Sequence, residues 1–81
     1  MGAWSPEQAI AMEERHIIEG EVRVARQEAL VVKLIEKGHG RLLAAAEDLL
    51  VTLRESVELS RERLLWLTNR YGNPPHSQSQ Y

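Results

Sequence analysis

The chain has 81 residues, with 12 acidic and 10 basic side chains, a formal net charge of −2 and no cysteine. A chain of this length forms one domain at most, and without cysteine it has no disulfide framework and no thiol chemistry. Its two charge signs are interspersed, unlike the basic face typical of nucleic-acid-binding proteins. No apolar run approaches the eighteen or so residues of a membrane-spanning helix. We find no motif that commits the chain to a reaction, so we expect a cytoplasmic, non-enzymatic protein with no cofactor that binds neither nucleic acid nor a membrane.

A first helix is predicted from Pro6 to Lys37. Ser5 is a favourable N-cap, Pro6 suits the first helical position, and Gln8 completes a Ser-x-x-Gln capping box. Trp4 precedes this cap and is placed to fold back onto Ala9 or its neighbour. Gly38 then ends the helix, because glycine readily adopts the left-handed conformation of a helix C-cap.

A second helix is predicted over residues 41–71, after the turn formed by residues 38–40. Gly40 is only an acceptable N-cap, so this helix begins less sharply than the first. Gly72 ends it and Pro74-Pro75 prevent its resumption. Residues 1–72 therefore form a helical hairpin, and residues 73–81, which are polar and have no periodicity, are expected to be a disordered tail.

Each predicted helix carries a coiled-coil seam in which residues alternate at spacings of three and four. The first seam contains Ile10, Ile17, Gly20, Val24, Gln27, Val31 and Leu34. The second contains Leu43, Ala46, Leu50, Leu53, Val57, Ser60, Leu64, Leu67 and Tyr71. With the chain reversing at His39, residue i should lie near residue 78 minus i, which brings Gly20 to Val57 and Ser60. Gly20 allows a close helix approach, and Gln27 sets the register if its side chain finds a hydrogen-bond partner.

Further apolar residues lie outside the two seams and have no use in a lone hairpin. Ordering about 60 residues costs roughly 90 kcal/mol, which at about 25 cal/mol per Å² requires apolar burial on the order of 3,600 Å². One narrow interface between two helices does not supply that area. We therefore predict a homo-oligomer, most simply a dimeric four-helix bundle, that serves as a protein–protein interaction or regulatory module, with a further protein partner left open. The predicted oligomer interface is Ile18, Val22, Ala25, Ala29, Val32, Leu42, Leu49, Leu59 and Trp66.

The alternative function is a metal-binding carboxylate bundle. Glu13 and His16 have the Glu-x-x-His spacing that supplies metal ligands in ferritin-like bundles, since residues three apart share one helix face. The antiparallel register places Glu58 and Glu62 near His16, and a dimer would double the set. The structural interpretation of these residues is a solvated or salt-bridged face. His16 is also open to interpretation as a phosphorelay histidine, although Ile17 follows it where an acidic residue is usual.

The segment from His16 to Gln27, followed by Leu30, Leu34 and Gly38, resembles a pattern in short uncharacterised bacterial proteins. The resemblance covers most of both predicted helices and implies a bacterial helical hairpin of similar length. Those proteins would have Thr or Ser capping the second helix, where this chain has Gly40 and Arg41. The resemblance transfers no functional residue.

Overall fold

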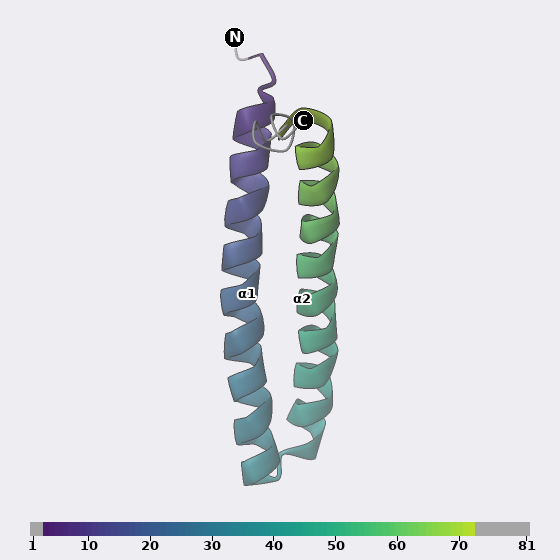
Figure 1. Ribbon diagram of the computed structural model, residues 1–81. Helices are drawn as coiled ribbons and strands as arrows, with labels where there is room; N and C mark the ends of the chain where they lie inside the picture. Colours follow the sequence, from purple (N-terminus) through teal and green to yellow (C-terminus); the bar gives the residue numbers. More distant parts are fainter. Residues whose placement is uncertain (1–2, 73–81) are drawn as a thin grey trace, which may run out of the picture.

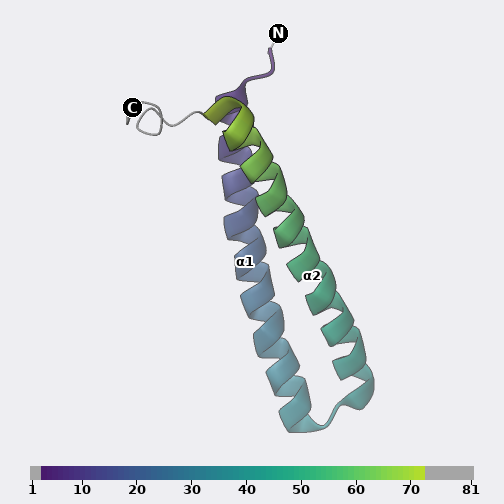
Figure 2. The same ribbon diagram turned by 45° about the vertical axis from the view of Figure 1, so that its right-hand side comes forward.

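The computed structural model describes residues 3–72 as a helical hairpin (Figure 1). Helix α1 runs from Pro6 to Lys37 and helix α2 from Gly40 to Leu67, and a short π-helical turn, η1, follows over Thr68–Gly72. The two long helices pack side by side, and residues 3–72 contain no strand. This confirms the all-α hairpin. Seen from a second angle, the helices overlap near η1 and separate towards the turn, so their axes are inclined (Figure 2).

The predicted caps of α1 are both present. The Ser5 hydroxyl oxygen accepts a hydrogen bond from the Gln8 N–H at 3.3 Å, and Ser5 itself is extended, as an N-cap should be. At the other end Gly38 has a φ of 73°, in the left-handed region. Its N–H and that of His39 donate to the carbonyls of Ile35 and Leu34, which would otherwise lack partners at the helix end.

Helix α2 differs from the prediction at both ends. It begins at Gly40, one residue early, and its N-cap His39 makes no side-chain hydrogen bond to the helix. The regular helix ends at Leu67, not at residue 71, because the chain widens into η1. This wider turn brings Tyr71 to Trp4, with ring centroids 5.1 Å apart in an edge-to-face arrangement. The predicted disordered tail, residues 73–81, lies outside the described residues.

The seam between the helices is the only place where side chains of residues 3–72 are buried. Its buried members include Gly20, Gln27 and Leu34 on α1 and Leu50, Val57 and Leu67 on α2. No large side chain in the described part is completely buried, which reflects an interface only one seam wide. Among the same residues, no helix is long and apolar enough to cross a membrane.

Candidate functional site

The helices approach each other closely at Gly20, which packs against Val57. A Cβ atom placed on Gly20 would lie 2.7 Å from Val57 Cγ2, so only glycine fits at this crossing. The contact confirms the predicted pairing of Gly20 with Val57. Beside it lies a hollow of about 190 Å³, whose lining includes His16, Arg23, Ser56, Ser60 and Arg63. We call this side of the hairpin the hollow face.

Gln27 forms the buried polar layer expected in the middle of the seam. Its Nε2 donates a hydrogen bond of 2.9 Å to the carbonyl oxygen of Ala46 on the other helix. A buried amide without a partner would be costly, so this bond removes the penalty and links the two helices at one level. Gln27 is therefore a structural residue of the hairpin, and its side chain is directed away from solvent.

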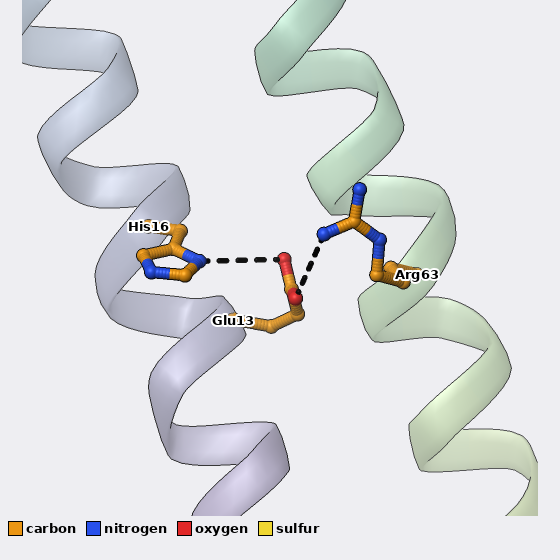
Figure 3. A network of polar contacts seen from close by, with 3 residues as sticks. All are labelled: Glu13, His16 and Arg63. Carbon is orange, nitrogen blue, oxygen red and sulfur yellow. Dashed lines mark hydrogen bonds and ion pairs between the residues drawn. The ribbon is translucent and has the colours of Figure 1, made fainter.

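The seam contains one charged residue that the sequence analysis did not place there. Glu13 is 7% exposed and occupies the position between Ile10 and Ile17. Figure 3 shows its carboxylate between His16 on α1 and Arg63 on α2. Glu13 Oε2 lies 3.3 Å from Arg63 Nη1, and Oε1 lies 3.9 Å from His16 Nδ1, beyond hydrogen-bonding distance. Oε1 therefore has no hydrogen-bond partner among the described residues.

The four candidate metal ligands do not converge in the hairpin. Glu13 and His16 are neighbours, but the Glu13 carboxylate turns to Arg63. Glu58 lies 4.0 Å from Arg61 and lines a different hollow, while Glu62 is exposed. Within residues 3–72, no three His, Asp or Glu side chains are placed to hold one metal ion. The reason is the turn of the helix, which places Glu58 on the side of α2 opposite the hollow face.

The other broad side of the hairpin, which we call the ion-paired face, carries two ion pairs between the helices. Arg54 contacts Glu28 at 2.6 Å, and Arg61 contacts Glu21. Each of these four side chains is about half exposed, so each pair contributes well under about 1 kcal/mol. The two pairs lie at the edge of the seam, where charged residues of paired helices commonly meet across the interface.

The apolar residues outside the seam form two separate strips. The α1 strip consists of Ile18, Val22, Ala25, Ala29 and Val32, and the α2 strip consists of Leu42, Leu49, Leu59 and Trp66. All nine are exposed in the hairpin, from 44% at Val22 to 63% at Ile18 for the larger side chains.

These two strips lie on opposite sides of the molecule. Ala25 borders the ion-paired face, because it lines a hollow with Glu21, Glu28 and Arg54. Leu42 and Leu49 precede Ser56 at steps of seven residues, two helical turns each, so they share the hollow face. The nine predicted interface residues therefore do not form one continuous surface, and a single flat contact does not cover them all.

Comparison with known proteins yields no significant match: no family model fits the chain, and neither a curated protein nor a solved structure is similar to it. The resemblance of residues 16–27 to short bacterial proteins therefore stays a prediction, as does the bacterial origin.

Proposed function

We propose that this protein is a small non-enzymatic protein–protein interaction module that works as a homo-oligomer, with two hairpins forming a four-helix bundle. The observation that carries the proposal is the exposure of large apolar side chains on both helices. Ile18, Leu42, Leu65 and Trp66 are each more than half exposed, while no large side chain of residues 3–72 is fully buried.

The energetics of a lone hairpin support the same proposal. Soluble monomers seldom expose contiguous apolar surface beyond a few hundred Å², and exposed strips of this length mark interaction sites. Small domains without disulfides commonly gain the missing burial by oligomerising. A second hairpin adds a second layer of helices and turns each narrow seam into one side of a common core.

A concentration series tests the proposal most directly. Folding and dimerisation should be coupled, so that the stability of the protein depends on its concentration. The thermal midpoint followed by circular dichroism should therefore fall by several degrees over a hundredfold dilution. Light scattering during gel filtration should give a mass of about twice the 9.2 kDa chain. A monomeric mass at micromolar concentration, with full helicity and a dilution-independent midpoint, would refute self-association.

A further inference from the structure

The hollow that defines the hollow face is lined by hydrogen-bond donors that the hairpin leaves unused. Ser56 and Ser60 both line it, and neither hydroxyl makes a hydrogen bond within residues 3–72. Thr52, one turn earlier in α2, instead donates to the carbonyl oxygen of Asp48 in its own helix, as hydroxyl side chains in helices commonly do. The two serine hydroxyls are therefore available to a ligand in the hollow.

The unused hydroxyl of Ser60 is informative because this residue is only 9% exposed. A buried polar group without a hydrogen-bond partner is costly and calls for an explanation. Among residues 3–72, Glu13 Oε1 is the one fully enclosed side-chain oxygen that lacks a partner. The Ser60 oxygen therefore keeps contact with solvent, and it does so through the hollow that Ser60 lines. A ligand group in the hollow supplies the missing hydrogen bond.

Two arginines line the hollow from its opposite ends. Arg23 is three residues past Gly20 on α1, a rise of ~4.5 Å towards the turn. Arg63 is six residues past Val57 on α2, a rise of ~9 Å in the other direction, because the helices are antiparallel. A ligand held over the Gly20–Val57 contact is therefore flanked by an arginine at each end.

Both guanidinium groups have N–H donors that are not engaged. Arg23 forms no ion pair within residues 3–72. Arg63 contacts Glu13 through one terminal nitrogen at 3.3 Å (Figure 3), which leaves most of its five N–H groups free. Glu19 is the only carboxylate among the residues that line the hollow, and its side chain is exposed. The lining therefore has more positive than negative charge and more donors than acceptors.

We propose that the hollow is a binding site for a phosphate group. Arginine pairs its parallel N–H donors with phosphate oxygens, and donors that approach from both ends and from the serine hydroxyls suit a tetrahedral oxyanion. A planar carboxylate has only two oxygens, which a single arginine engages. His16 also lines the hollow and adds a ring donor.

The size of the hollow limits what it holds. Its volume of about 190 Å³ is below the roughly 300 Å³ of the smallest typical small-molecule pockets. It therefore holds the phosphate group itself and leaves the remainder of a larger molecule outside. The site is built by one hairpin, so it does not depend on the self-association proposed above.

Titration with inorganic phosphate, followed through the amide resonances by NMR at constant ionic strength, tests the site. The shifts should saturate and centre on Gly20 and Ser60, with sodium chloride as the reference. Arg23→Gln should raise the Kd for phosphate about tenfold, because it removes charge-assisted hydrogen bonds. Ser60→Ala should raise the Kd about threefold and, since the lost hydroxyl has no partner in the protein, should not lower the thermal midpoint without phosphate.

Two further variants separate a defined site from general attraction to positive charge. Arg15 is exposed on α1, does not line the hollow and forms no ion pair within the described residues, so Arg15→Gln removes the same charge elsewhere. It should leave the Kd within about twofold, because salt screens distant exposed charges. Glu19→Gln should lower the Kd about threefold by removing the one repulsive carboxylate of the lining. Equal losses in Arg15→Gln and Arg23→Gln would overturn the site.

Phosphoserine in place of inorganic phosphate identifies the source of the bound group. A Kd equal to or lower than that of inorganic phosphate indicates a phosphate monoester carried by a larger molecule, and a higher Kd indicates the free ion. If the shifts saturate with neither probe, the inference is wrong. The proposed self-association is unaffected by that result, because it is measured separately as a mass in solution.

Discussion

Gly20 and Val57 are in close contact across the two helices, with room for a hydrogen but not for a Cβ atom at residue 20. Glycine in a helix interior costs about 1 kcal/mol relative to alanine. That cost is offset by the close approach, which lets the neighbouring Ser60 and Gln27 be buried in the same seam.

Gly20→Ala should therefore destabilise the protein although alanine is the better helix former. Val57 is β-branched and held in one rotamer in a helix, so its methyl group does not simply rotate away. Overpacking of about 1–3 kcal/mol should outweigh the gain in propensity of about 1 kcal/mol. The thermal midpoint by circular dichroism gives the net effect.

The matched control is the same change in a Val57→Ala background. With the obstructing methyl group removed, Gly20→Ala should become stabilising by up to about 1 kcal/mol. A reversal of sign between the two backgrounds identifies the contact as the cause. The same sign in both backgrounds would show that the helices move apart freely at this level.

The hairpin should be more stable with an apolar side chain at position 13 than with the Glu13 carboxylate. Glu13→Leu fills a seam position between Ile10 and Ile17 and removes a buried charge whose Oε1 has no hydrogen-bond partner. Replacing a buried ion pair by a hydrophobic residue is often neutral or stabilising by about 1–4 kcal/mol. Because Arg63 is 59% exposed, we expect the low end of that range.

Arg63→Ala tests the other half of the pair. Alone it should cost about 1–2 kcal/mol, because it leaves the Glu13 carboxylate buried without its cation. In the Glu13→Leu background the same change should cost under about 0.5 kcal/mol, as for an ordinary surface substitution. Urea denaturation of the four variants completes the cycle, and equal costs in both backgrounds would contradict the ion pair.

Much of the hairpin was predictable because its determinants are local. Ser5 and Gly38 act within one helical turn, and the three-and-four spacing of the seam residues fixes which sides of the helices meet. Glu13 was missed although its position, three after Ile10 and four before Ile17, already placed it in the seam. Its charge suggested an exposed ligand, whereas the partner that makes burial tolerable, Arg63, lies fifty residues away.

The sequence also contained the information that the two strips lie on different faces of the hairpin, but this was not recognised. Members of the α1 strip follow seam residues by one or two positions, as Ala25 follows Val24, whereas Leu49 precedes the seam residue Leu50. In an antiparallel pair these two offsets point to opposite faces. The end of α2 at Leu67 had no such signal in the sequence, and the π-helical turn that follows it brings Tyr71 to Trp4, a residue distant in the chain.

Gln27→Glu should be strongly destabilising at neutral pH. The substitution removes the donor to the Ala46 carbonyl and sets a buried carboxylate against that oxygen, at a cost of about 2 kcal/mol or more. Gln8→Glu makes the same chemical change in the exposed first turn of α1, where the helix dipole favours negative charge. Guanidinium denaturation should separate the two variants clearly, and similar midpoints would mean that the Gln27 side chain is solvated in solution.

A cluster of three aromatic side chains should stabilise the end of the hairpin that lies opposite the turn. Tyr71 packs edge-to-face on Trp4 at 5.1 Å and on Trp66 at 6.1 Å, and Arg70 lies 5.5 Å from the Trp66 ring. Aromatic pairs of this geometry contribute about 0.5–1.5 kcal/mol beyond the area they bury. Tyr71→Ala should therefore cost about 1–2 kcal/mol and increase hydrogen exchange in the first turns of α1, which no longer meet η1.

Tyr71→Phe is the matched control, because it keeps the ring and loses only the hydroxyl, which accepts a 3.3 Å hydrogen bond from the exposed Arg70 Nε. This variant should exchange and melt like the unmodified protein. Trp4→Ala should reproduce the effect of Tyr71→Ala, and the double variant should cost less than the two single changes together, because both remove the same contact. Fully additive costs would show that Trp4 and Tyr71 act independently, so that the wider turn at Thr68–Gly72 would need a cause other than their contact.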